Sequence, residues 1–110
     1  MEETDYCVVL NTCPNRTTGE QIARQLVEQR LAACVNLVDR ITSIYRWEDG
    51  IEEEQETLLI IKTEKTCYPS LEKTLQELHP YEVPEIIQLP ITNGSTSYLE
   101  WIHQNTYKTR

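Results

Sequence analysis

The chain has 110 residues, of which 39% are hydrophobic and 25% charged, and its formal net charge at pH 7 is −8. This length fits one domain, expected over residues 1–110 with an ordered core at about 5–105. Nucleic-acid binding draws its affinity from Lys and Arg on phosphates, so the acidic balance argues against that function and against an anionic membrane surface.

The chain contains no apolar window long enough to span a bilayer. Its N-terminal sequence, MEETDY, lacks the basic and apolar parts of a signal peptide. The four cysteines, at positions 7, 13, 34 and 67, form no C-x-x-C pair. Without a secretion signal we expect reduced thiols and a cytoplasmic protein.

The first predicted elements are a strand and a helix. Residues 6–12, YCVVLNT, are apolar on both alternating faces, which is typical of a strand covered on both sides. Thr17 with Glu20, and Thr18 with Gln21, have the spacing of a capping box. A helix is therefore predicted to begin there and to end near Leu31.

A long hairpin follows, because residues 33–48 alternate with period two. One face of this strand is predicted to carry Val35, Leu37, Ile41, Tyr45 and Trp47. Asp39 interrupts that apolar row, which predicts a bulge near Asp39 and Arg40. Residues 48–50 predict the turn, and the partner strand begins as an acidic arm at 51–56 and becomes apolar at 58–61. We expect the turn end of this hairpin to project beyond the compact body.

The second half repeats the pattern of helix and strand. Tyr68 and Pro69 open a helix, since proline suits the first turn, and this helix is predicted to stop before His79. The connector HPYEVPE at 79–85 is stiffened by its prolines and delivers a strand at about 85–92. Ser97 with Glu100 has capping-box spacing, which predicts a third helix at roughly 95–104.

This order of elements predicts an α+β protein with the ferredoxin-like βαββαβ fold and an extra C-terminal helix, with the first and third strands in the middle of the sheet. Two helices cover only one face. The other face is predicted to show either Cys7 and Val9 or Val8 and Leu10, together with one of the pairs Leu58/Ile60 and Leu59/Ile61. Because such a row of aliphatic side chains favours association, we infer a homo-oligomer.

Two residues are candidates for a metal site. His79 lies in the proline-stiffened connector, and Cys13 lies at the end of the first strand. Imidazole and thiolate ligands suit copper or zinc. The competing interpretations are a hydrogen-bonding role for His79 and redox or nucleophilic chemistry for Cys13. The acidic run at 52–56 is interpreted as a solvated strand end that prevents indiscriminate pairing.

A second set of residues combines aromatic rings with charges, which suits either a ligand cleft or, as we favour, a subunit interface. The set consists of Tyr45, Trp47, Lys62, Glu64, Tyr81, Glu85 and Trp101. The sequence contains no P-loop, no G-x-G-x-x-G, no H-E-x-x-H and no G-x-S-x-G. We therefore expect no enzyme and no obligatory cofactor.

Five blocks of sequence are similar to the CutA family: RLAACVN at 30–36, YRWEDG at 45–50, IKT at 61–63, HPYEVPEI at 79–86 and GSTSYLEWI at 94–102. The similarity covers about residues 8–104. It implies a PII-like homotrimer with its sheets packed inward, an association with divalent-cation tolerance, and Cu(II) or another divalent cation as the ligand. The alternative is a PII-like signalling or adaptor trimer whose inter-subunit clefts bind a small ligand or a protein partner.

The same resemblance implies a copper site built from a cysteine in the first strand and two consecutive histidines before Pro-Tyr. Asn11, Leu78 and His79 occupy those positions in this chain. Only His79 keeps the ligand type, and Cys13 stands two residues beyond Asn11 as a substitute.

Overall fold

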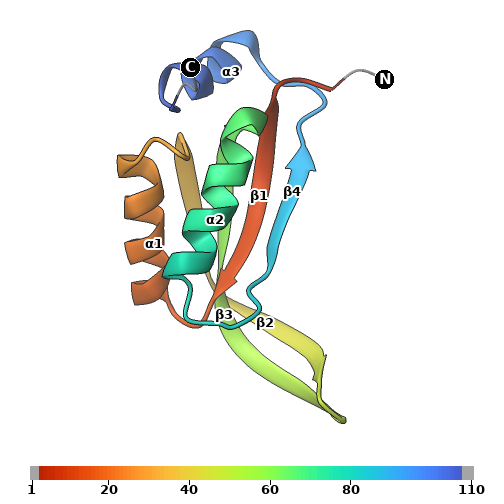
Figure 1. Ribbon diagram of the computed structural model, residues 1–110. Coiled ribbons are helices and arrows are strands. Elements are labelled where there is room, and N and C mark those ends of the chain that lie inside the picture. Colours follow the sequence, from red (N-terminus) through yellow and green to blue (C-terminus); the bar gives the residue numbers. More distant parts are fainter. Residues whose placement is uncertain (1–2, 108–110) are drawn as a thin grey trace.

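The computed structural model describes residues 3–107, so the ends of the expected domain, 1–2 and 108–110, lie outside the described residues. The α+β class and the predicted order of helices and strands are confirmed (Figure 1). The elements are β1 (Tyr6–Cys13), α1 (Arg16–Glu28), β2 (Cys34–Trp47), β3 (Gly50–Glu64), a 3-10 turn (Lys65–Cys67), α2 (Tyr68–Leu78), β4 (Ile86–Pro90) and α3 (Thr96–Gln104). In the described part of the chain, no helix has the length and apolarity needed to cross a membrane.

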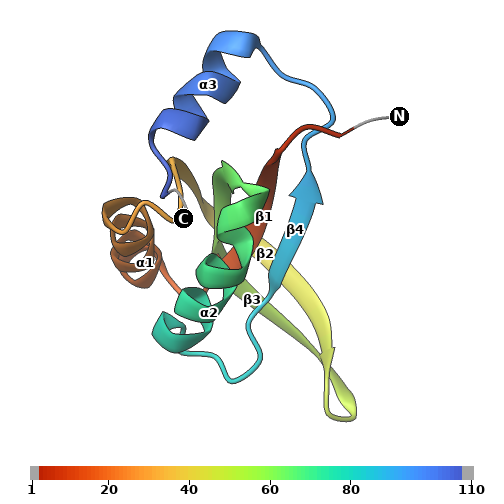
Figure 2. The same ribbon diagram turned by 45° about the horizontal axis from the view of Figure 1, so that its top comes forward.

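The four strands form one antiparallel sheet in the order β2-β3-β1-β4. Strands β1 and β3, which contain the apolar segments YCVVL and LLII, occupy the middle, as predicted. Helices α1 and α2 lie on the same face of this sheet, which both views show (Figures 1 and 2). The helix pair therefore leaves the opposite face, called the open face below, without a covering layer in the described chain.

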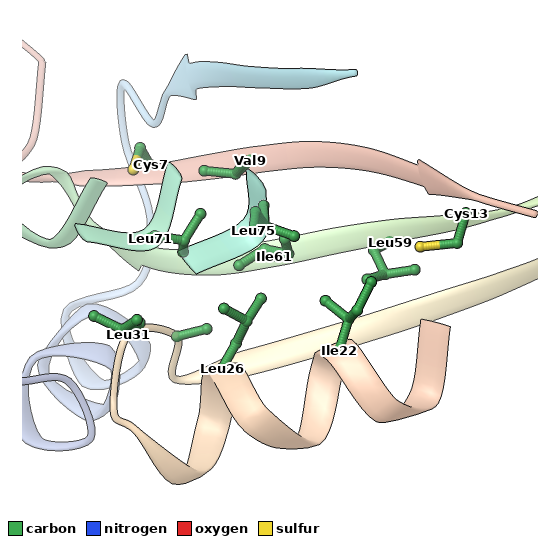
Figure 3. Packing of buried hydrophobic residues seen from close by; sticks show 11 residues of the cluster. Cys7, Val9, Cys13, Ile22, Leu26, Leu31, Leu59, Ile61, Leu71 and Leu75 are labelled. Carbon is green, nitrogen blue, oxygen red and sulfur yellow. The ribbon is translucent and has the colours of Figure 1, made fainter. Parts of the chain in front are cut away.

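The core fills the space between the helices and the sheet (Figure 3). Its main side chains are Cys7, Val9, Leu59 and Ile61 from the sheet and Ile22, Leu26, Leu71 and Leu75 from the helices, each at most 3% exposed. A fully buried side chain of this size contributes about 1.5–3 kcal/mol, so this layer is the main source of stability. The sequence left open which side of the first strand faces the helices. Cys7 and Val9 face them, so Val8 and Leu10 lie on the opposite face.

The open face is apolar along its two central strands and one edge strand. Alternation and pairing place Val8, Leu10, Leu58, Ile60, Ile87 and Leu89 on it. On the edge strand, Ile87 is 47% exposed and Leu89 44% exposed. An apolar face of this kind is the feature from which the sequence predicts association.

Helix α1 begins and ends differently from the prediction. Asn15 is its N-cap, and the Asn15 side chain accepts a hydrogen bond of 2.8 Å from the Thr18 amide. The predicted threonine caps are wrong because both threonines already lie within the first turn. The helix ends at Glu28, before Leu31, in a Schellman motif: Arg30 takes a left-handed conformation with φ 59°, and the amide of Leu31 reaches the carbonyl of Leu26.

A bulge interrupts β2 at the predicted place. Val38 pairs with Leu58 and Ile41 pairs with Glu56, so β2 uses one residue more than β3 between these pairs, and Arg40 adopts φ 57°. This extra residue reverses the alternation. Val35 and Leu37 therefore face the helices, whereas Ile41, Tyr45 and Trp47 lie on the open face, and the prediction of one shared face is wrong.

Beyond the bulge, β2 and β3 continue as a two-stranded arm (residues 41–56) that projects from the body, as predicted (Figure 1). Its turn consists of Glu48 and Asp49, between the paired residues Trp47 and Gly50. Glu48 takes the left-handed conformation, with φ 54°, while Gly50 already belongs to β3.

The connector after α2 carries the chain from the helix layer to the edge of the sheet. Helix α2 ends at Leu78, one residue before His79, as predicted. The last strand, β4, is shorter than the predicted 85–92. Helix α3 is capped by Ser95, whose hydroxyl oxygen accepts from the Tyr98 amide at 3.3 Å, so the predicted cap at Ser97 is wrong.

Candidate functional site

The structure brings the two candidate metal ligands together. The Sγ atom of Cys13, at the end of β1, lies 3.8 Å from Nε2 of His79, the residue that follows α2. Cys13 is fully buried and His79 is 7% exposed. Two elements far apart in sequence therefore place a thiol and an imidazole in contact beneath the connector.

The hydrogen bonds of His79 fix its protonation state. Its Nδ1 accepts from the backbone amide of Tyr81 at 3.1 Å, and an amide N–H can only donate. Nε2 therefore carries the ring hydrogen and donates to the carbonyl oxygen of Thr12 at 2.8 Å. Burial lowers the pKa of His79, while the hydrogen bond to Thr12 acts in the opposite direction. The ring is a neutral link between β1 and the connector.

Asn11 supplies a second link at the position where the resemblance implies a cysteine. Its side-chain amide donates to the carbonyl oxygen of Glu85 at 2.8 Å, and its Oδ1 accepts from the Cys13 thiol at 3.3 Å. Asn11 is completely buried. The residue therefore fastens the far end of the connector to β1.

The donor types and their separation fit a copper or zinc ion. Bonds of about 2.3 Å to sulfur and about 2.0 Å to nitrogen together span the 3.8 Å between Cys13 and His79. Within residues 3–107, no group of three or more His, Cys, Asp and Glu side chains is placed to hold one ion. The pair thus offers two ligand atoms. Burial and then the charge of Glu56 raise the pKa of the Cys13 thiol to about 11, so the thiol is protonated at neutral pH. It would have to lose this proton before it could bind a metal ion.

A Cys–His contact is also the signature of a cysteine nucleophile, but such a thiol needs a lowered pKa and access to solvent. The raised pKa and complete burial of Cys13 point the other way. The arrangement is therefore not suited to acyl transfer by Cys13.

A groove of about 900 Å³ opens next to this pair, between the arm and the connector. We call it the acidic aromatic groove. Its aromatic residues are Tyr45, Trp47 and Tyr81, its acidic residues are Glu52, Glu54, Glu56, Glu82 and Glu85, and its other lining residues are Thr12, Ser43, Ile44, Arg46 and Val83. Thr12 and Tyr81, which hold His79, also line the groove, so the two features share a wall.

Two tyrosine–carboxylate hydrogen bonds order the groove. The Tyr45 hydroxyl donates to Glu54, and the Tyr81 hydroxyl donates to Glu56 at 2.7 Å. The hydrogen bond to Glu54 raises the pKa of Tyr45 to about 12, and burial, followed by the bond to Glu56, raises that of Tyr81 above its ordinary range. Both phenols are therefore neutral donors over the physiological range.

The predicted cleft set divides between three places. Tyr45, Trp47, Tyr81 and Glu85 come together in the groove. Lys62 lies elsewhere on the open face, where its ammonium group donates to Asn36. Glu64 and Trp101 lie at the opposite end of the molecule: Glu64 accepts from His103 and Thr106, and Trp101 stacks on Tyr98 with 5.6 Å between ring centroids.

Sequence reasoning missed the residues that complete both features. Asn11 holds the connector through its side-chain amide, and Thr12 holds it through its backbone carbonyl. Only Asn11 could have been noticed in the sequence, because it is a polar residue within an apolar strand. Glu54 and Glu56 were interpreted as a solvated strand end, yet Glu56 is 8% exposed and hydrogen-bonded. Glu54 and Glu56 are two residues apart in a strand, so their side chains share one face of β3, and this spacing could have predicted that they act together.

Comparison with known proteins agrees with this fold. The profile of the family described as "CutA1 divalent ion tolerance protein" matches residues 7–105. The chain is 50% identical over 99 residues to the divalent-cation tolerance protein CutA of Thermus thermophilus, covering 90% of this chain and 96% of that protein. The solved Thermus thermophilus structure titled "Divalent cation tolerance protein (Cut A1)" superimposes with a TM-score of 0.90 at 49% identity, covering 93% of this chain and 99% of that one.

A mouse relative named Protein CutA is 52% identical over 95 residues, which cover 86% of this chain. The chain spans about half the length of that relative, 54%. The profile match over nearly the whole chain and the 50% identity to the bacterial protein lead to one conclusion: the chain belongs to the CutA1 divalent ion tolerance protein family.

Proposed function

We propose that this protein is a cytoplasmic homotrimer that binds copper or another divalent cation and thereby contributes to tolerance of that cation. The observation that carries the proposal is the 3.8 Å contact between Cys13 Sγ and His79 Nε2. Sulfur and imidazole nitrogen are the ligands that copper and zinc prefer in proteins. No catalytic step is part of the proposal.

Binding at this pair requires local changes that the hydrogen bonds identify. Cys13 must release its proton, and Nε2 of His79 must give up its hydrogen and its bond to the Thr12 carbonyl. The hydrogen then belongs on Nδ1, which in turn no longer accepts from the amide of Tyr81. Metal uptake is therefore coupled to proton release and to a shift of the connector.

The open face supports the homotrimer. Its aliphatic side chains extend across β3, β1 and β4, and Ile87 and Leu89 are nearly half exposed in a single chain. Packing against copies of the same face removes this surface from water. The fourteen-residue edge strand β2 offers unpaired backbone groups for contact between subunits. All four cysteines are free thiols, which is consistent with the reducing cytoplasm.

The test is a calorimetric titration of the reduced, tag-free protein with copper, with its mass measured by light scattering. We expect saturable binding by an assembly of three chains. Cys13→Ser and His79→Gln should each weaken binding by at least about tenfold, since each removes one of two soft ligands. Cys34→Ser is the matched control, because it removes a half-buried thiol outside the pair.

Equal affinities of Cys13→Ser and the unaltered protein would refute the metal site. Weak, unsaturating uptake would show that the surface carboxylates collect cations nonspecifically. A mass other than that of three chains would refute the trimer while leaving the metal site to be judged by the titration.

A further inference from the structure

We propose that Asn93 is a site of spontaneous deamidation, in which the backbone amide of Gly94 displaces the side-chain amide nitrogen of Asn93 as ammonia. The product carries a new carboxylate in the segment between β4 and α3 (residues 91–95). This chemistry uses no residue of the Cys13–His79 pair and none of the acidic aromatic groove. The proposal depends on the residue that follows Asn93, on the position of its side chain, and on the exposure of the segment.

The residue after Asn93 distinguishes it from the other asparagines. The sequence has asparagine at positions 11, 15, 36, 93 and 105, and only the one at 93 precedes a glycine. Deamidation needs the backbone nitrogen of the next residue to approach the side-chain carbon Cγ. A Cβ atom on that next residue crowds the approach, and glycine has none. The other four asparagines precede threonine, arginine, leucine and threonine, so the sequence selects one position.

The structure places the two reacting groups of Asn93 and Gly94 next to each other. The Gly94 amide donates a hydrogen bond of 3.0 Å to Oδ1 of Asn93, so the side chain is folded over the peptide that follows it. Because Oδ1 is bonded to Cγ, the carbon to be attacked lies beside the Gly94 nitrogen. Two other asparagine side chains are engaged elsewhere: Asn11 donates to the Glu85 carbonyl, and Asn15 caps α1.

The segment is open to the water and base that the reaction requires. Residues 92–97 are all exposed, and residues 91–95 belong to no helix or strand. The segment follows the last strand, at the end of the molecule opposite the arm, and therefore lies outside the open face (Figure 1). A connecting segment of this kind moves more freely than a strand or a helix. Its backbone can therefore bring the Gly94 nitrogen over Cγ of Asn93.

The reaction needs no partner other than water. The Gly94 nitrogen gives up its proton and forms a bond to Cγ of Asn93, the bond from Cγ to Nδ2 breaks, and Nδ2 leaves as ammonia. The resulting five-membered succinimide is opened by water at one of its two carbonyl carbons. Breakage of the new bond from Cγ to nitrogen gives aspartate. Breakage of the original peptide bond gives isoaspartate, in which the main chain runs through the side chain.

The two products differ in their effect on α3. A carboxylate at position 93 lies two residues before Ser95, the N-cap of α3, where the helix dipole favours negative charge. An isoaspartyl residue instead adds one carbon to the backbone just before Gly94. Gly94 packs so closely on α3 that an added Cβ would lie 3.1 Å from Cδ2 of Leu99. The aspartyl product therefore preserves this packing, and the isoaspartyl product disturbs it.

The experiment incubates the whole, reduced protein, and the same protein unfolded in guanidinium chloride, in mildly acidic and mildly alkaline buffer at one temperature. Digestion and mass spectrometry locate the gain of about 1 Da that accompanies replacement of the amide by a carboxylate. We expect this gain at Asn93 in the folded protein, faster in the alkaline buffer, with separate aspartyl and isoaspartyl peptides. The peptide of Asn15, which is also exposed, is the internal control and should stay unchanged.

Asn93→Gln is the matched variant, because its longer side chain would have to close a larger ring, and it should abolish the gain. A gain that persists in that variant, or equal gains in the peptides of Asn15 and Asn93, would overturn the proposal. A folded protein that reacts more than about tenfold more slowly than the unfolded chain would show that the fold protects Asn93, and would also overturn it. Isomerisation at Asp49 and Gly50 changes no mass, so it is not mistaken for this reaction.

Discussion

The open face can be tested by comparing a carboxylate placed on it with one placed in the core. Ile60 and Leu59 are neighbours on β3, but Ile60 points to the open face and Leu59 is fully buried under the helices. We expect Ile60→Asp to prevent assembly while the subunit keeps its fold. Leu59→Asp should prevent folding altogether. Two adjacent positions thus separate subunit association from subunit stability.

The loss of association free energy in Ile60→Asp follows from the burial of Ile60 that is lost and from the charge that is introduced. Burial of an isoleucine between subunits contributes about 2 kcal/mol, and an unpaired buried carboxylate costs about 3 kcal/mol more. In a symmetric assembly every copy carries the substitution, so a trimer loses this amount three times. Since about 1.4 kcal/mol changes an equilibrium constant tenfold, Ile60→Asp should be monomeric at micromolar concentration.

Light scattering gives the mass, and far-ultraviolet circular dichroism reports the fold. Val27→Asp is the control: it places the same charge on the exposed side of α1, where 42% of Val27 is accessible, and should leave the mass unchanged. An assembly of unchanged mass in Ile60→Asp would refute the inward-facing sheet. An equal loss of assembly in Val27→Asp would show that added charge, rather than its place, is responsible.

Three further predictions concern the connector and the thiols. Burial raises the pKa of Cys7 and Cys13 from 9.0 to about 11. The folded chain therefore holds these two protons more tightly than the unfolded chain does. The contribution of the two thiols to the free energy of unfolding is complete below pH 9 and is lost as the pH rises through 11. Urea unfolding of Cys13→Ser should show a shallower loss over that interval, and an unchanged loss would contradict the assignment. Asn11→Ala should cost about 1–3 kcal/mol of unfolding free energy, because the Glu85 carbonyl loses its buried donor; a cost no larger than that of Asn36→Ala would contradict it. Tyr81→Phe should cost about 1–3 kcal/mol by leaving Glu56 without its donor, and clearly less in a Glu56→Gln background; equal costs in both backgrounds would exclude the coupling.

The fold was predictable where many residues point to the same element. The apolar patterns and the prolines predicted where the helices and strands lie along the chain. The usual right-handed connections predicted that β1 and β3 occupy the middle of the sheet. Which face of β1 turns inward was not predictable, since Val8 and Val9 are equally apolar and only the position of the helices distinguishes them. The helix caps were wrong where Asn15 and Ser95 compete with threonine and serine two or three residues away.

The candidate site was predictable only in part. The two candidate ligands, Cys13 and His79, were chosen by residue type, and their contact depends on a turn whose course the sequence does not reveal. The state of His79 depends on a carbonyl and an amide of the backbone, which have no signature in residue type. The groove required knowledge of the bulge, because Tyr45 and Trp47 reach the face of the glutamates only through the reversed alternation.

That bulge makes the chain sensitive to changes of length at one point. Residues 35, 37, 41, 45 and 47 would share one face in a regular strand, yet the first two serve the core and the last three serve the groove. Deletion of one residue at 39–40 would restore regular pairing and turn the aromatic side chains away from the glutamates. None of the side chains that line the groove would be replaced by this change. Homologues that keep both halves of the groove should therefore keep the number of residues between positions 38 and 41, and residue 40 should be one that tolerates the left-handed conformation.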